Sequence, residues 1–144
     1  MPDARRFVLD TNVLVSAALL PEGGVRRYEP TRLCVEAARR DGVLLVSAAT
    51  LAELREVLLR PTFDRLKPRA GREAFLAAIE AEAERVEPAE VQPLCSDPDD
   101  DKFLAVALAG GADVLLTEDK AVLALKTVGR TRILRPIAFA RQRG

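Results

Sequence analysis

The stretch Phe7-Val8-Leu9-Asp10-Thr11-Asn12-Val13-Leu14-Val15-Ser16-Ala17 decides the fold. Its first three residues form a short apolar run typical of a buried strand, and the polar Asp10-Thr11-Asn12 then makes a turn. The apolar run from Val13 to Leu20 that follows is typical of a helix packed against a core. A strand that passes directly into a helix begins the alternation that builds parallel sheets.

The same alternation continues along the chain. Strands are predicted at 7–9, 43–46, 114–116 and 132–134, and helices at 13–20, 31–41, 48–60, 69–85, 97–110 and 118–126, with a short basic helix at the end. The strand at 43–46 is a continuous apolar run, which is typical of strands that are buried on both faces of a parallel sheet. We therefore expect an α/β fold, a three-layer α/β/α sandwich with a central parallel sheet, and one domain spanning residues 1–144.

Composition limits the classes of protein that fit. With 144 residues, 49% of them hydrophobic, the chain can bury a core of its own. No run approaches the roughly 18 apolar residues of a membrane helix, and the first residues lack the apolar part of a signal peptide, so we expect a cytoplasmic protein. The chain has no histidine, and Cys34 and Cys95 form no C-x-x-C pair. A zinc site and histidine-dependent nucleophilic catalysis are therefore not expected, and both cysteines are interpreted as buried free thiols.

The charges are segregated although they sum to zero. Residues 73–101 hold ten acids and one base, whereas residues 120–144 hold seven bases and no acid. A basic surface of this kind can meet an anionic partner, and a solvated tail is the alternative. A second basic stretch is predicted to contact nucleic-acid phosphates, and consists of Arg60, Arg65, Lys67, Arg69 and Arg72. The alternatives for this stretch are a linker or a surface that meets another protein chain.

Two acids lie where open parallel sheets form their sites, just beyond the carboxyl ends of strands. Asp10 directly follows the first strand, and Asp119 follows the strand at 114–116 after two intervening residues. A turn or cap acid, stabilised by the positive end of a helix, is the alternative interpretation for each.

Glu53 differs from its neighbour Glu56 on the same predicted helix. Glu56 has Arg60 four residues later, whereas Glu53 has no basic residue at helical spacing. We therefore expect Glu53 to be a partly inward carboxylate that needs a positive charge from elsewhere. An ordinary exposed glutamate is the alternative.

The acidic run at 97–101 has a structural explanation as the start of a helix, with Asp97 as cap and Pro98 in the first position. Asp101 shares a helical face with the apolar Leu104, which aims it toward the sheet. The spacing does not decide between Asp101 and Asp100, and Asp99 is expected to be the most exposed of the run.

Four segments in this order resemble the PIN domain family, and within it the VapC-like toxins of toxin-antitoxin systems. They are Val8-Leu9-Asp10-Thr11-Asn12-Val13-Leu14-Val15-Ser16-Ala17, Leu51-Ala52-Glu53-Leu54, Asp97-Pro98-Asp99-Asp100-Asp101-Lys102-Phe103-Leu104 and Leu116-Thr117-Glu118-Asp119-Lys120. Each segment alone is a weak signal, but the four together extend over about residues 7 to 125.

The resemblance implies a Mg²⁺- or Mn²⁺-dependent endoribonuclease that is the toxin of a type II pair, with RNA as substrate, a cognate antitoxin and a homodimer. The matching metal-binding and catalytic residues are Asp10, Glu53, Asp101 and Asp119, with Asn12 and Thr117 as supporting polar residues. The chain departs from the family pattern in two places. The segment 25–31 is longer than usual, and Glu118 stands where a small or basic residue is common.

Hard carboxylate oxygens suit Mg²⁺ and Mn²⁺, and four crowded acids would repel one another without a cation. We assign Asp10 and Asp101 to direct coordination, and Asp119 and Glu53 to a second ion, water-mediated contacts or activation of water. A haloacid-dehalogenase phosphatase would need an aspartate where the chain has Asn12. The alternative function that stays open is a non-catalytic module that binds RNA or a partner protein.

Overall fold

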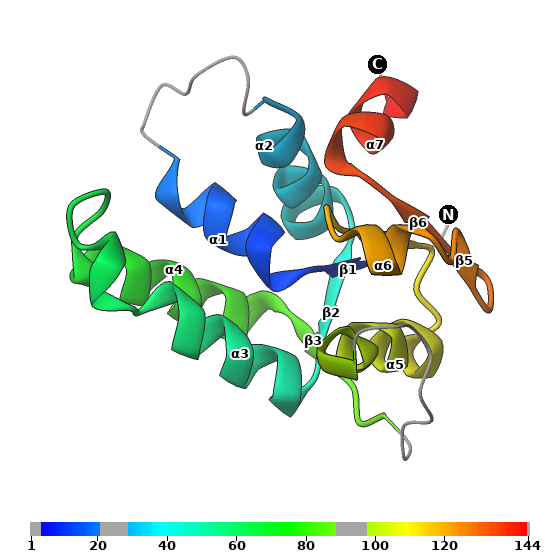
Figure 1. Ribbon diagram of the computed structural model, residues 1–144, viewed down its shortest axis with the longest axis horizontal. Helices are drawn as coiled ribbons and strands as arrows, with labels where there is room; N and C mark the ends of the chain where they lie inside the picture. Colours follow the sequence, from blue (N-terminus) through cyan, green and yellow to red (C-terminus); the bar gives the residue numbers. More distant parts are fainter. Residues whose placement is uncertain (1–3, 21–28, 89–97, 144) are drawn as a thin grey trace.

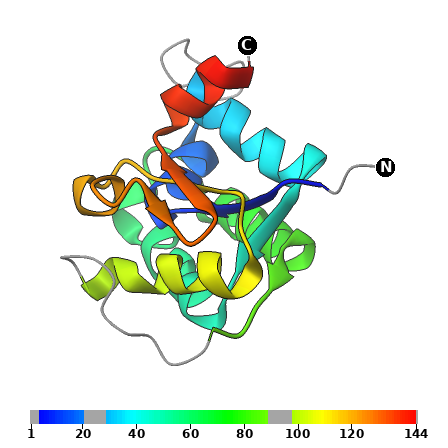
Figure 2. The ribbon, with the colours of Figure 1, turned by 90° about the vertical axis from the view of Figure 1, so that its right-hand side faces the viewer.

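The computed structural model describes residues 4–20, 29–88 and 98–143 and has a sheet with helices on both faces (Figures 1 and 2). The strand order is β3-β2-β1-β4-β6-β5, and every neighbouring pair is parallel except β5 and β6. The strands are β1 (Arg6–Leu9), β2 (Val43–Val46), β3 (Glu84–Arg85), β4 (Val114–Leu116), β5 (Thr127–Val128) and β6 (Thr131–Leu134). The predicted α/β/α sandwich around a mostly parallel sheet is confirmed.

The helices of the described residues divide between the two faces of the sheet. They are α1 (Thr11–Leu19), α2 (Glu29–Glu36), η2 (Ala37–Asp41), α3 (Ala48–Leu58), η3 (Pro61–Phe63), α4 (Arg69–Glu82), η4 (Pro98–Asp100), α5 (Asp101–Gly110), α6 (Lys120–Leu123) and α7 (Pro136–Arg143). Phe7 and Leu9 belong to the core cluster that contains side chains of α1 to α4 and α7. Val8 belongs to the cluster beneath α5 and α6, because successive side chains of a strand point to opposite faces. Figure 2 shows α5 on the other side of the sheet from α2 and α7.

The strand register places the first acid at the carboxyl edge of the sheet. Leu9 pairs with Leu116 of the neighbouring strand β4, and the backbone N–H of Asp10 donates to the Leu116 carbonyl at 3.0 Å. Helix α1 then begins at Thr11 without an intervening loop. The ends of these two neighbouring strands therefore bring residues 10 and 117 together, although they are far apart in sequence.

Helix α3 has the predicted start. The Ser47 hydroxyl accepts from the backbone N–H of Thr50 at 3.2 Å, and the Thr50 hydroxyl accepts from the Ser47 N–H at 2.9 Å. This reciprocal cap satisfies two backbone donors that the first turn leaves without helical partners. It fixes the start of the helix that carries Glu53.

The predicted helix at 48–60 ends at Leu58, and two other predicted helices extend further beyond the observed ones. The helix predicted to reach residue 85 ends at Glu82, because residues 84–85 pair with β2 as strand β3 and the Val86 N–H donates to the Val46 carbonyl at 2.8 Å. The helix predicted at 118–126 is reduced to 120–123, and β5 then pairs with β6 in a hairpin that was not predicted. Gly129 in its turn has a φ of 56°, which glycine adopts without strain.

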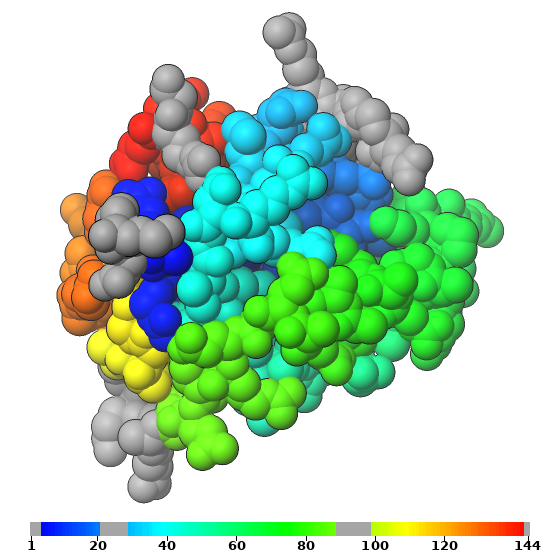
Figure 3. Space-filling model, turned by 180° about the vertical axis from the view of Figure 1, so that it is seen from behind, coloured from blue at the N-terminus to red at the C-terminus, as the bar shows by residue number. Residues whose placement is uncertain are grey.

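The back of the molecule joins η2 to the end of α4. Arg39 Nη2 lies 2.6 Å from Glu82 Oε2, and Figure 3 shows these two segments side by side. Cys34 is buried, as predicted, whereas Cys95 lies outside the described residues. Of the longer segment at 25–31, only residues 29–31 are described, and they begin α2. None of the described helices is both long enough and apolar enough to pass through a membrane.

Candidate active site

Asp10 and Asp119 are joined through Thr117. Asp10 is 7% exposed, and its Oδ2 accepts from the Thr117 hydroxyl at 2.7 Å. The Thr117 oxygen in turn accepts from the backbone N–H of Asp119 at 3.0 Å. Thr117 is fully buried, so its hydroxyl is held in one place between the acids that follow β1 and β4.

The surroundings of Asp10 disfavour its negative charge. Burial raises the pKa of the Asp10 carboxyl, hydrogen bonds from Thr117 and the Asn12 backbone lower it, and the charges of Glu53 and Asp119 raise it further. The net effect is a raised pKa. A cation beside Asp10 would relieve this because it stabilises the ionised carboxylate.

Glu53 has the external counter-ion that the sequence indicated it needs. Its Oε1 lies 2.8 Å from Lys102 Nζ, and its Oε2 accepts from the Thr11 hydroxyl. The side chain is 28% exposed, which agrees with the predicted partly inward position. Glu56 pairs instead with Arg60 at 2.8 Å, as the spacing predicted. Lys102 was not singled out in the sequence, although it directly follows Asp101.

Asp101 is the first residue of α5 and is 7% exposed, whereas Asp99 is exposed, as expected from the helical spacing. Asp100, at the cap position of α5, is half-buried. Burial therefore increases stepwise from Asp99 to Asp101 and does not by itself exclude Asp100 from the site. Asp101 and Lys102 both begin α5, so the lysine that contacts Glu53 comes from the same turn as the third acid.

Asp119 caps α6. Its Oδ1 accepts from the backbone N–H groups of Ala121 at 2.8 Å and Val122 at 3.3 Å. The alternative interpretation of Asp119 as a helix cap is therefore correct, and it uses only the Oδ1 atom among the hydrogen bonds of the described residues. One carboxylate can both cap a helix and bind a ligand, because its two oxygens together offer about four acceptor sites.

Asp10, Glu53 and Asp119 are linked in this arrangement, whereas Asp101 is placed only as the buried first residue of α5. Electrostatic contact links Asp10 to Glu53 and to Asp119. Among the described residues, however, no three acidic or sulfur side chains are close enough together to form a ready-made metal site. The donor chemistry suits Mg²⁺ or Mn²⁺, because carboxylate oxygens are hard donors and the negative charge of the buried Asp10 is disfavoured without a cation.

A groove of about 390 Å³ opens between the starts of α1, α2 and α7. Asn12 and Glu118 line it, and each lies close in sequence to one of the acids that follow β1 and β4. The other lining residues are Val13, Ser16, Pro30, Thr31, Pro136 and Ile137. Asn12 therefore faces the groove with its polar side chain, its supporting role stays a prediction, and Glu118 adds a negative charge to the groove.

Arg72 requires a correction to the predicted nucleic-acid surface. It is 0% exposed, and its guanidinium donates to the carbonyls of Lys67 and Leu58 at 2.9 Å and of Arg60 at 3.1 Å. Its Nη2 also pairs with Asp64. Arg72 holds the turn between α3 and α4 together, so it cannot reach a nucleic acid.

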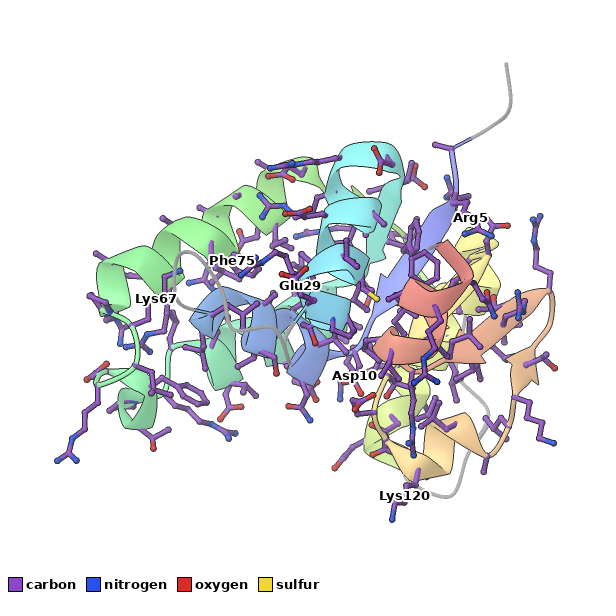
Figure 4. All side chains as sticks on the ribbon, turned by 90° about the horizontal axis from the view of Figure 1, so that it is seen from above. Arg5, Asp10, Glu29, Lys67, Phe75 and Lys120 are labelled. Atoms are coloured by element: carbon purple, nitrogen blue, oxygen red, sulfur yellow. The ribbon has the colours of Figure 1, made fainter. Side chains whose placement is uncertain are left out.

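The other basic residues of this stretch are at least partly exposed, and none of them lines the groove. Arg65 and Arg69 are exposed and Lys67 is half-buried, and Figure 4 shows Lys67 and Asp10 in separate parts of the molecule. Arg60 already pairs with Glu56. The basic stretch therefore does not line this groove.

Comparisons with known proteins identify the family of this domain and proteins that share its fold. The PIN domain profile matches residues 6–121, which contain all four acids. The comparison with curated proteins gave no match. A chain of VapBC2 from Rickettsia felis, solved bound to a DNA fragment from its promoter, is 15% identical with a TM-score of 0.57, and the match covers 90% of this chain and 98% of that one.

Two further structures are similar over almost the same extent. A chain of VapBC-1 from nontypeable Haemophilus influenzae is 18% identical with a TM-score of 0.55, and the match covers 92% of this chain and 98% of that one. VapC20 from Mycobacterium tuberculosis, a toxin that cleaves the sarcin-ricin loop, is 15% identical with a TM-score of 0.53, covering 88% and 98%. At these identities the likeness shows a shared fold.

Proposed function

Since this chain belongs to the PIN domain family, as the four acidic segments predicted, we propose that it is a divalent-metal-dependent endoribonuclease and the toxin of a toxin-antitoxin pair. The observation that carries the proposal is the buried Asp10 carboxylate, whose pKa is raised by burial and by the charges of Glu53 and Asp119. Burial of uncompensated negative charge destabilises a fold, and it is typical of sites that bind a cation.

In this proposal Asp10 and Asp101 would hold Mg²⁺ or Mn²⁺ directly, and Asp119 and Glu53 would contribute through water. When bound, such an ion lowers the pKa of a water molecule and stabilises charge on the oxygens of the cleaved phosphate. The protein supplies positioning. Thr117 fixes the Oδ2 atom of Asp10 by its hydrogen bond, and Thr11 fixes the Oε2 atom of Glu53.

The groove between the starts of α1, α2 and α7 is the proposed path of the RNA strand. Asn12 offers an exposed amide there, which can donate to a phosphate or a base, while Ser16 and Thr31 offer hydroxyl groups. Glu118 would repel phosphate on one side of the groove. Selectivity would then depend on the shape of the RNA more than on general attraction to its charge.

Arg65, Lys67 and Arg69 have a different proposed role, because none of them lines the groove and Lys67 lies away from Asp10 (Figure 4). They would hold a distant part of a folded RNA, or form part of the surface that meets the antitoxin or a second protomer. Two of the similar structures are VapBC assemblies, which supports an antitoxin partner for this chain. The homodimer stays a proposal from the family.

The test is cleavage of a panel of structured RNAs by purified protein with Mn²⁺, with and without a chelator. We expect cleavage that chelator abolishes and that Asp10→Asn reduces to background. Asp41→Asn, which changes an exposed acid at the end of η2, should retain activity. Equal cleavage in chelator would refute the proposal, and Mn²⁺ binding without cleavage of any RNA would favour the non-catalytic module.

A further inference from the structure

Lys102 carries an inference that rests on the proposed function and extends it. Its Nζ lies 2.8 Å from Glu53 Oε1 and donates to the Asp99 carbonyl at 2.7 Å. It also lies 5.7 Å from the centre of the Phe103 ring. These contacts come from α3, η4 and α5, so the ammonium group is held from several sides rather than extended into solvent.

The contact differs from the surface ion pairs of this protein. Lys102 and Glu53 are 24% and 28% exposed, whereas Arg60 and Glu56 on α3 are 51% and 64% exposed. A less exposed pair is screened less by water and salt, so its electrostatic effect on nearby acids is larger. The nearby acid is Asp10, which lies within electrostatic range of Glu53.

Both carboxylate oxygens of Glu53 are engaged. Oε1 accepts from Lys102 and Oε2 accepts from Thr11. Direct coordination of an ion by Glu53 would need one of these contacts to weaken. The positive charge next to Glu53 is therefore a side chain of the protein, Lys102, and not a metal ion.

We propose that Lys102 is a positioning residue that acts as a fixed cation in place of a second divalent ion, so that the site binds one Mg²⁺ or Mn²⁺ per chain. Glu53 is then neutralised and oriented by Lys102, and the single ion is left to Asp10 and the remaining acids. The ammonium group also limits the affinity for that ion, because two positive charges in one site repel each other.

The first test counts bound Mn²⁺ by electron paramagnetic resonance during titration of metal-free protein. The wild type should bind one ion per chain, and so should Lys102→Arg, which keeps the charge. Lys102→Met should bind a second ion, or bind the first about tenfold more tightly, since the repulsion is removed. Lys126→Met removes an equal charge from an exposed residue in the turn between α6 and β5 and should match the wild type.

The second test uses the protein without metal, so it does not depend on activity. Lys102→Met leaves Glu53 uncompensated beside Asp10, and should lower the Tm by about 2–4 °C relative to Lys126→Met. Adding Glu53→Gln to Lys102→Met should restore most of this loss, because the uncompensated charge is then gone. A purely structural lysine would lose stability in both backgrounds and would not increase Mn²⁺ binding.

The outcomes separate this inference from the proposed function. Two ions per wild-type chain, or a Lys102→Met variant identical to Lys126→Met in Mn²⁺ binding, would overturn the role of Lys102 while leaving a metal-dependent nuclease in place. Absence of Mn²⁺ binding in the wild type would overturn both. One ion in the wild type with increased binding in Lys102→Met supports both the site and the fixed cation.

Discussion

Replacement of Arg72 by methionine should destabilise the fold and leave the chemistry of the site unchanged. The guanidinium is completely buried and donates to the carbonyls of Leu58, Arg60 and Lys67. Methionine fills part of the same volume but leaves three carbonyl groups without their donor. At about 1 kcal/mol for each buried acceptor, the free energy of unfolding should fall by roughly 3 kcal/mol.

For a domain of this size such a loss corresponds to a decrease in Tm of about 6–12 °C. Thermal unfolding followed by circular dichroism measures it, with Arg69→Met as the matched control. Arg69 is the exposed first residue of α4 and lies 3.8 Å from Glu73 in a surface ion pair that contributes little to stability. A Tm for Arg72→Met within about 2 °C of that for Arg69→Met would refute the structural role of Arg72.

Further predictions concern the acids and the elements that place them. The pKa of Asp10 is raised in the folded protein, so without metal its contribution to stability is full below the ordinary aspartate pKa and is lost as pH rises through the raised value. In urea titrations with chelator, Asp10→Asn should therefore gain stability relative to the wild type as pH increases from acidic to neutral. Thr117→Val removes the hydroxyl between Asp10 and Asp119, and should lower stability by about 1–2 kcal/mol and weaken Mn²⁺ binding measured by calorimetry. Ser47→Ala removes the cap of α3 and should lower stability by about 1 kcal/mol in the same urea assay.

The position of Asp10 could be predicted from sequence because local signals agree there. A continuous apolar run ends in Asp10-Thr11-Asn12 and an apolar helix follows, so strand, turn and helix are fixed by neighbouring residues. Register then places Asp10 beside Thr117, which needs only that β1 and β4 are parallel neighbours. The other predicted apolar runs, at 43–46, 114–116 and 132–134, likewise form strands of the sheet.

The short strands could not be predicted in this way. Glu84–Arg85 continues an acidic helical pattern in sequence, and becomes β3 only because β2 offers it a parallel partner. Strand β5 likewise depends on pairing with β6 across a turn at Gly129. Two residues carry too little periodicity to indicate a strand, so tertiary pairing decides both.

The two charged residues that sequence reasoning misplaced or missed depend on contacts between helices. Arg72 stands in a run of basic residues and gives no local sign of burial, yet the α3–α4 turn encloses it. Lys102 follows an acidic run, so the simplest expectation from sequence is an exposed lysine that neutralises its neighbours. Only the packing of α5 beside α3 brings it to Glu53, whose need for an external positive charge was the one available signal.

The central claim is that separated acids hold a divalent ion, and anomalous diffraction from a crystal soaked in Mn²⁺ tests it most directly. We predict one anomalous peak within coordination distance of both Asp10 and Asp101, at about 2.0–2.3 Å from their carboxylate oxygens. The peak should be absent from Asp10→Asn crystals treated in the same way. A Mn²⁺ peak located away from Asp10 and Asp101, or no peak in the wild type, would contradict the account.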